Sequence, residues 1–473
     1  MIYKKFNRLE RFAAIATAVL IFLFYLFFNY NYLSKWIDEK GDCNTYDYYV
    51  RLGIPKYLFN PHHIAFDWLG ERMYHAAKEN GYTGKAMTVL QMRNLLVSSI
   101  ALAILFWLFY KISKKYLLSL LLVGCISFTA AYWMYSQIND TPIIHSTMLA
   151  ILFLAAIAFP QVRHRHLYSI FLGMFHANLI FFHQSDLIFM IVIFFIYFFA
   201  DRMLEFAQSE LNTSQTFSEM CSLYLNKNKI RLQHYPSINI ANFKAFVIYF
   251  VTFCIIVAAA YYYVGIVKIG LTFDKSAATK LNGIQGATYF FNWLILYTKI
   301  DYWGKGFSDM STLEKVFQGI STYFYQPQKF GGQPLCFDFA HFIAPQHILP
   351  NMVGVLFIVT LGSTVILAGP LYRKYNYIFI ADLLFMVIYA VFSMWWEPDY
   401  REFWVAPMFS FWFMAFFVLN FFIDRAGTAL RPMMKLAVYT FLLTLGGLLF
   451  YFNWVGFIYP NVTHQFSKFE IMK

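Results

Sequence analysis

The sequence has few charged residues for its length. Only 13% of its 473 residues are Asp, Glu, Lys or Arg, whereas 60% are hydrophobic and the mean hydropathy is +0.51. An ordinary soluble protein carries about 25% charged residues. This deficit excludes a soluble domain and predicts an all-α polytopic membrane protein. The net charge of +12 then indicates no nucleic-acid partner, because cytoplasmic loops collect Lys and Arg and membrane lipid attracts them.

Cysteine and the common catalytic motifs are also scarce or missing. None of the five cysteines forms a C-x-x-C metal spacing, although Cys43 and Cys336 lie in predicted external loops and could pair. The chain has no P-loop, nucleophile elbow or H-E-x-x-H helix. His62 and His63 are adjacent, so their rings diverge and cannot chelate one ion together. We therefore expect no cofactor, and a divalent metal only if other parts of the chain supply ligands.

What the chain does contain is eleven apolar segments of a length that can cross a bilayer. They predict an N-terminal module over residues 1–245 and a C-terminal module over residues 246–473. The second module includes a long external loop over residues 268–350. The predicted spans are Phe12–Leu33, Asn94–Ile112, Leu117–Tyr135, Ile143–Phe159, Leu167–Phe182, Leu187–Ala200, Phe246–Val267, Met352–Leu371, Tyr377–Trp395, Phe403–Ile423 and Leu436–Trp454.

The basic residues of the connections predict the orientation. They gather in alternate connections, which the positive-inside rule assigns to the cytoplasm. The short loops near Asp140 and Asp186 carry no Lys or Arg. We therefore expect a cytoplasmic amino terminus and an external carboxyl terminus. A bacterial inner membrane with the site facing the periplasm is favoured, and an ER membrane is the alternative. The basic residues concerned are Lys4, Lys5, Arg8, Arg11, Lys111, Lys114, Lys115, Arg163, Arg165, Arg202, Lys227, Lys229, Arg231, Arg373, Lys374, Arg425, Arg431 and Lys435.

A polar island follows the first span, in a predicted external loop over residues 35–93. It contains Gly41–Asp47 and then Asn60–His63. Beyond it, apolar residues such as Ile64, Trp68 and Met73 recur at helical spacing. This pattern predicts interfacial amphipathic helices in the first external loop. Carboxylates and imidazoles at the end of a membrane span are groups that can do chemistry there.

These features resemble the GT-C glycosyltransferases, which include protein O-mannosyltransferases and lipid A aminoarabinose transferases. Asp42-Cys43-Asn44-Thr45-Tyr46 follows the Asp-x-x-x-Tyr pattern of their first loop, although Cys43 stands where a second acidic residue is usual. Asn60–His63 is similar to a His-Pro or Pro-rich stretch of the group, and Tyr132–Asp140 resembles its second acidic loop. The turn at His183-Gln184 also looks similar. The resemblance covers residues 1–200.

The resemblance implies transfer of a sugar from a polyprenyl-phosphate donor to a glycan, lipid or protein acceptor. Such a reaction needs a base for the acceptor hydroxyl and cations for the departing phosphate. The catalytic candidates are Asp42 as general base, with Asp140 and Asp47. The phosphate-binding candidates are Arg401, Arg51, Arg93 and Lys305, with Lys299 as a further cation. The substrate-binding candidates are Tyr46, His62, His63, His183, Gln184 and Trp396.

Other interpretations of these residues stay open. Asp42 and Asp140 could cap helices, and we expect Asp186 to cap the sixth span. Arg401 could simply snorkel, and Trp396 could belong to an interfacial aromatic belt. Two other functions also remain. A transporter or flippase would need ionisable residues within its spans, which are nearly free of charge here. A non-catalytic membrane subunit would tolerate Asp42→Asn.

Overall fold

The described part of the chain is helical, as the sequence predicts. The computed structural model describes residues 7–31, 33, 42–209, 240–280, 286–295, 310–326, 344 and 347–460. Over these residues the extended pairing amounts to an isolated bridge between Thr272 and Tyr289. A helix satisfies its own backbone hydrogen bonds, which lipid cannot do. The all-α polytopic membrane class is therefore confirmed.

Nine helices among the described residues are long and apolar enough to cross a membrane. Several of them include a short 3-10 or π-helical stretch, at one end or, in the case of η7, between two α-helical parts. They are α1 (Arg8–Tyr30), α5 (Ala86–Ser113), α8 (Pro142–Ala158) with η1 (Phe159–Gln161), η2 (Gln184–Phe189) with α10 (Met190–Ser209), α12 (Ile240–Tyr262) with η3 (Tyr263–Ile269), α15 (Ile348–Phe357) with η7 (Ile358–Gly362) and α16 (Ser363–Ile366), α18 (Tyr377–Trp396), α19 (Arg401–Arg425), and α20 (Arg431–Asn453) with η8 (Trp454–Ile458).

The other two predicted spans take less regular forms. The third is a pair of helices, α6 (Tyr116–Ser127) and α7 (Ala130–Gln137), that meet at 66° and count as one broken span or a re-entrant loop. The fifth is α9 (Arg165–Ile180), a helix of 16 residues that packs along α12. Together with the nine helices, they account for all eleven predicted segments. The predicted module boundary at residue 245 falls within α12 and stays a prediction.

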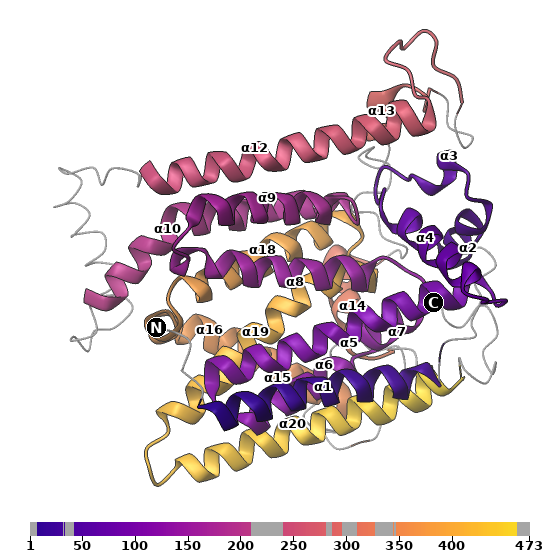
Figure 1. Cartoon of the computed structure of the whole chain (residues 1–473). Coiled ribbons are helices and arrows are strands. Elements are labelled where there is room, and N and C mark those ends of the chain that lie inside the picture. Colours follow the sequence, from indigo (N-terminus) through magenta and orange to yellow (C-terminus); the bar gives the residue numbers. More distant parts are fainter. Residues whose placement is uncertain are drawn as a thin grey trace.

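Most of the helices run roughly side by side, with α19 inside the bundle (Figure 1). α19 contacts α8, α18, α20 and the shorter α14 (Thr312–Phe324). Its apolar window is 94% buried, compared with 17% for α1 and for α12. A helix that is apolar on all sides packs in this way, because every face can be buried. α1, α12 and α20 form outer elements of the bundle (Figure 1).

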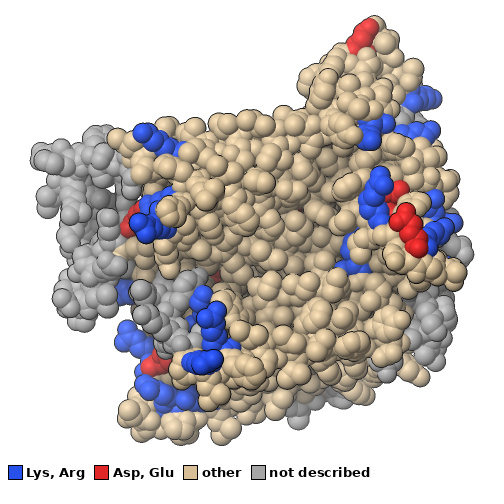
Figure 2. Space-filling model, in the orientation of Figure 1, with Lys and Arg blue, Asp and Glu red and all other residues tan. Residues whose placement is uncertain are grey.

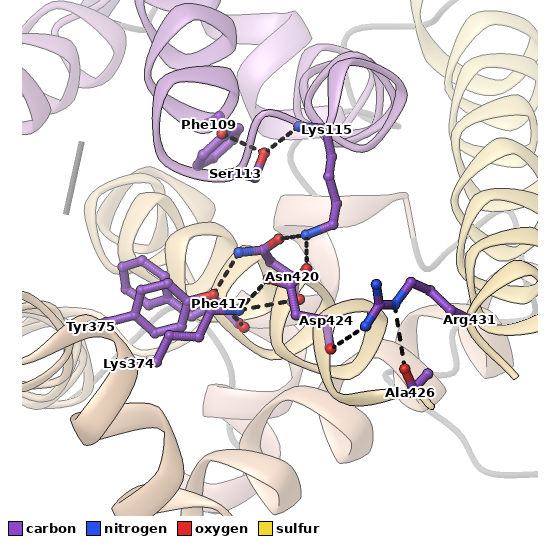
Figure 3. Close-up of polar contacts among 10 residues, drawn as sticks. All are labelled: Phe109, Ser113, Lys115, Lys374, Tyr375, Phe417, Asn420, Asp424, Ala426 and Arg431. Carbon is purple, nitrogen blue, oxygen red and sulfur yellow. Dashed lines mark hydrogen bonds and ion pairs between the residues drawn. The ribbon is translucent and has the colours of Figure 1, made fainter. Parts of the chain in front are cut away.

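Charged side chains gather toward the two ends of the bundle on the face that Figure 2 shows. At one end, the Nζ atoms of Lys115 and Lys374 lie 2.6 and 2.7 Å from the two carboxylate oxygens of Asp424 (Figure 3). Lys114 pairs with Glu10 at 2.7 Å. The connections that carry Lys115 and Lys374 were predicted to lie on the same side of the membrane, and in the structure they lie together. We call this the basic end.

The opposite end carries the first predicted loop, and we call it the loop end. It contains α2 (Asp42–Leu52), α3 (Pro55–Leu58) and α4 (Phe66–Glu79), so the loop is helical as predicted. α2 and α4 pack against each other and against the start of α5. Gly70 of α4 allows this approach, because a Cβ atom there would lie 2.4 Å from Leu90 of α5. The long later loop contributes α13 (Phe290–Leu294) and α14 to the same end (Figure 1).

Candidate functional site

The segment between α3 and α4 docks against the turn between α9 and η2. The backbone N–H of Ala65 donates to the carbonyl of Phe181 at 2.8 Å, and the N–H of Gln184 donates to the carbonyl of His62 at 3.0 Å. The Gln184 side chain also donates to the hydroxyl of Tyr261 at 3.1 Å. These bonds bring two of the predicted substrate-binding regions together, although more than 100 residues separate them in the sequence.

The docking creates a cluster of three histidines and one carboxylate, His62, His145, His183 and Asp186, which we call the histidine cluster. The ring centres of His62 and His183 lie 4.1 Å apart, and His145 stacks on His183 at 4.6 Å. Nδ1 of His145 lies 3.6 Å from Oδ1 of Asp186. The hydroxyl of Tyr389 on α18 donates to the same oxygen at 3.1 Å. Residues of α8, η2, α18 and the first loop thus meet at one point.

Two further predicted residues border this cluster. The Trp396 ring at the end of α18 stacks on His62 with 6.0 Å between ring centres. Both side chains are half-buried, so this is the part of the cluster that reaches the surface. On the other side, the Tyr46 hydroxyl hydrogen-bonds Nε2 of His63 at 3.2 Å, and both residues are buried. The structure therefore brings Tyr46, His62, His63, His183, Gln184 and Trp396 into one region.

A second group, the carboxylate cluster, consists of Asp140, Glu402 and Arg401. The hydroxyl of Thr141 donates to Oε1 of Glu402 at 3.5 Å. Tyr135 is within electrostatic range of both carboxylates and of the Arg401 guanidinium. Arg401 Nη1 also lies 3.4 Å from the side-chain oxygen of Gln326. This group adjoins the histidine cluster, because Asp140 lies two residues before α8 and His145 lies in the first turn and a half of that helix.

Arg93, a predicted phosphate-binding residue, is buried inside the protein and does not reach the surface as His62 and Trp396 do. Its side chain is 3% exposed and donates to the Phe66 carbonyl at 2.8 Å and to the side-chain oxygens of Asn94 and Asn139 at 3.2 Å each. Asn94 in turn donates to the Asp140 carbonyl at 2.6 Å. Arg93 thus ties α4 and α5 to the loop that carries Asp140. This geometry supports positioning of that loop rather than direct contact with phosphate.

The remaining predicted residues are placed less completely. α2 begins at Asp42, whose side chain lies outside the described residues, as do Lys299, Lys305 and Cys336. The carbonyl of Cys43 accepts a hydrogen bond from Asn139 at 3.4 Å, so the start of α2 lies beside the loop of Asp140. Asp47 pairs with Arg51 at 2.8 Å within α2. This pairing keeps Arg51, which is 53% exposed, on the helix surface.

Sequence reasoning missed two members of the site and misassigned a third. The missed members are His145 and Glu402. The sequence offered one signal for each: a histidine inside an apolar segment, and a glutamate directly after the predicted Arg401. Asp186 does not cap η2 as predicted. The cap is His183, whose ring accepts from the Ser185 N–H at 3.3 Å, which frees Asp186 to face His145. Asp140 accepts from the Thr141 N–H at 2.7 Å, so part of its alternative capping role is present.

Burial lowers the pKa of three histidines of the first loop and of the turn before η2. It lowers the pKa of His63 to about 3, with repulsion from His62 as the next cause. Burial, and then repulsion from His145, lowers the pKa of His62 to about 4, and burial lowers that of His183. Neutral imidazoles can accept hydrogen bonds from sugar hydroxyls. Among the described residues, no three His, Cys, Asp or Glu side chains are grouped to hold a metal ion.

The lowered pKa of His63 predicts that acid destabilises the loop end. His63 is ordinarily protonated below pH 6.5 when unfolded, whereas the folded protein resists protonation down to about pH 3. The unfolded state therefore binds more protons between these values, and stability falls as pH falls through this range. The expected loss at pH 5 is about 2 kcal/mol. Thermal unfolding in detergent at pH 7 and pH 5 measures it.

His63→Gln should reduce this pH dependence, because glutamine does not titrate. The matched control is His75→Gln on α4, since the His75 side chain is 52% exposed. An equal reduction in both variants would show that buried His63 is not the source.

No protein family, curated protein or solved structure matches this chain. The functional assignment therefore depends on the site geometry and on the sequence resemblance described above.

Proposed function

We propose that the protein is a membrane glycosyltransferase. It transfers a sugar from a polyprenyl-phosphate donor to a hydroxyl of a glycan, lipid or protein at the loop end. The observation that carries this proposal is the convergence of the histidine and carboxylate clusters at the start of α8, beside the start of α2. The groups gathered there suit a lipid-linked anionic sugar. They are carboxylates, a guanidinium, neutral imidazoles and an indole, all at one end of the helix bundle.

The proposed chemistry is an inverting displacement at the anomeric carbon. The acceptor oxygen forms the new bond to that carbon while the bond to the phosphate oxygen breaks. The electron pair leaves with polyprenyl phosphate, and the acceptor proton passes to a carboxylate, for which Asp42 is the candidate. Asp140 and Asp47 are the other candidate carboxylates. Glu402 joins this set because it lies with Asp140 in the carboxylate cluster.

Binding groups follow from the same arrangement. Arg401 would neutralise the departing phosphate, because a guanidinium matches two phosphate oxygens. Trp396 and His62, half-buried and stacked, would contact the sugar. The loop end would face the periplasm if the protein lies in a bacterial inner membrane, or the lumen in an ER membrane. This side follows from the positive-inside rule applied to the basic end.

Arg401→Ala tests the phosphate assignment. A charge-assisted hydrogen bond contributes about 1.5–3 kcal/mol, so the donor should bind about tenfold or more weakly. The assay measures binding and turnover of labelled polyprenyl-phosphate sugars by purified protein, with a membrane extract supplying acceptors. Arg72→Ala on α4 is the control, because the Arg72 side chain is 65% exposed and pairs with neighbouring Glu71. Equal donor affinity in the two variants would remove Arg401 from the site.

A transporter of lipid or solute is the second candidate, and one observation favours it. The spans hold more buried polar groups than the low charge content suggests. Asp382 is fully buried and accepts from Ser410 at 2.7 Å, and buried His176 contacts the Asp186 carbonyl at 2.9 Å. Intramembrane ionisable residues often mark transport pathways. The test uses proteoliposomes that contain the purified protein and the labelled donor. Movement of the donor across their bilayer without sugar transfer would favour the transporter.

A further inference from the structure

One carboxylate inside the bundle, that of Asp186 in η2, has no role in the chemistry proposed above. Its side chain is fully buried, and the Tyr389 hydroxyl of α18 donates to its Oδ1 at 3.1 Å. Nε2 of His176 lies 2.9 Å from the Asp186 carbonyl, and Nδ1 of His176 lies 2.5 Å from the Tyr249 hydroxyl. A carbonyl can only accept, so His176 donates through Nε2 and accepts from Tyr249 through Nδ1. Contacts from α9 and α18 therefore hold Asp186 in place, with α12 behind them.

The Asp186 carboxylate has few hydrogen bonds for a buried charged group. Among the described residues, its Oδ2 has no hydrogen-bond partner, and neither has Nδ1 of His145. These two residues already face each other, because Nδ1 of His145 lies 3.6 Å from Oδ1 of Asp186. A hydrogen bond from N–H to O is about 2.7–3.2 Å long, so a shift of about half an ångström would form one. Unpaired buried groups are costly, and hydrogen bonds in a binding site are often long until the ligand is bound.

The contact with Asp186 determines which nitrogen of His145 can accept a hydrogen bond. An ionised carboxylate accepts only, so it favours a neutral ring with the proton on Nδ1 and the lone pair on Nε2. Nδ1 of His145 is fully enclosed, so the 7% of this side chain that is exposed lies elsewhere on it. An Nε2 atom with a lone pair accepts hydrogen bonds from hydroxyl groups.

His145 lies between the histidine cluster and the carboxylate cluster. It follows Thr141 by four residues, so both side chains lie on one face of α8. The Thr141 hydroxyl donates to Glu402 of the carboxylate cluster at 3.5 Å. On its other side, the His145 ring stacks on His183, which contacts the half-buried His62. A ligand that spans the two clusters therefore passes His145.

We propose that Nε2 of His145 accepts a hydrogen bond from a hydroxyl of the donor sugar, and that Asp186 is the positioning residue that orients the ring. The inference rests on the proposed glycosyltransferase function for the identity of the ligand. Binding of the sugar draws the Nδ1–H of His145 onto Oδ1 of Asp186, while Tyr389 holds the carboxylate. No bond of the sugar breaks at His145, so this residue contributes affinity for the sugar and does not take the acceptor proton.

His145→Phe tests the contact with the sugar. Phenylalanine keeps a flat ring against His183 but has no acceptor atom. Purified protein in detergent is titrated with polyprenyl-phosphate mannose, glucose and N-acetylglucosamine, and with polyprenyl phosphate, which has no sugar. The variant should bind the donor that the wild type prefers about tenfold more weakly, with unchanged affinity for polyprenyl phosphate. His166→Phe is the matched control, because His166 is exposed at the start of α9, whose other end leads into the site.

Asp186→Asn tests the positioning role with a measurement that needs no donor. Asparagine keeps the size of the side chain and can accept from Tyr389, but it has no charge to hold the Nδ1–H of His145. Nitrogen NMR of protein with isotope-labelled histidine should show His145 protonated mainly at Nδ1 in the wild type and less so in Asp186→Asn. The signals that His145→Phe lacks identify the residue. Asp186→Asn should also weaken binding of the sugar-bearing donor and leave binding of polyprenyl phosphate unchanged.

The possible failures are distinguishable. Donor binding that is equally tight in the wild type and in His145→Phe would overturn the sugar contact, and so would equal weakening of both ligands, which indicates a structural role. A wild-type His145 protonated mainly at Nε2 would overturn the positioning role of Asp186. If the wild type binds no sugar-bearing donor more tightly than polyprenyl phosphate, the glycosyltransferase proposal itself fails and the sugar contact fails with it. The NMR result still decides in that case whether Asp186 orients His145.

Discussion

Asp42→Asn should reduce turnover of the polyprenyl-phosphate sugar by about 10²–10⁴-fold, the usual effect of losing a general base. Asparagine keeps the size of the side chain and some hydrogen bonding but cannot take the acceptor proton. α2 begins at Asp42, and its first residues lie beside the loop that carries Asp140. Expression and thermal stability should change little, because Asp42 is the first residue of α2, which is not one of the membrane-spanning helices. Initial rates with labelled donor measure the effect.

Parallel variants decide which carboxylate is the base. Asp47→Asn should have a small effect, because Asp47 is already paired with Arg51 at 2.8 Å. Asp140→Asn and Glu402→Gln report on the carboxylate cluster. Near-normal turnover by Asp42→Asn with collapse in Asp140→Asn would move the base to the second loop. Full activity in all four variants would leave the glycosyltransferase proposal without a mechanism and favour the subunit or transporter alternatives.

Arg93→Met should have the largest effect on stability, a loss of about 3–5 kcal/mol in the free energy of unfolding. Methionine fills the volume but leaves the Phe66 carbonyl and the Asn139 amide oxygen without their donor. It also removes the positive charge that acts on buried Asp67. Removal of one partner from a buried charged network is costly, because the other groups stay desolvated.

The matched control is Arg51→Met, which removes an exposed ion pair that contributes at most about 1 kcal/mol. Chemical unfolding in mixed micelles compares the two variants. Donor affinity, measured where both variants are folded, separates positioning from binding. A fall in donor affinity with unchanged stability would return Arg93 to the phosphate-binding set.

The low charge content and the apolar segments were sufficient to predict the class and nearly every helix of the bundle. Hydrophobicity acts locally, so a segment that must lie in lipid shows it in its own residues. The broken span formed by α6 and α7 was harder to predict from the sequence. No proline at the junction of α6 and α7, around Ser127 and Thr129, indicates a break in the sequence. The 66° bend occurs where α7 packs against α5 and α14.

The candidate site was likewise predictable in part from the sequence and in part only from the tertiary structure. The sequence by itself determined that His62, His183, Asp140, Trp396 and Arg401 lie at loops or helix ends, because polar types and spacing are visible along the chain. Only the tertiary structure decided that His145 and Asp186 face each other and that the Arg93 guanidinium is enclosed by Phe66 and Asn139. These contacts join residues 27 to 46 positions apart. They depend on how the faces of separate helices pack, which local periodicity does not contain.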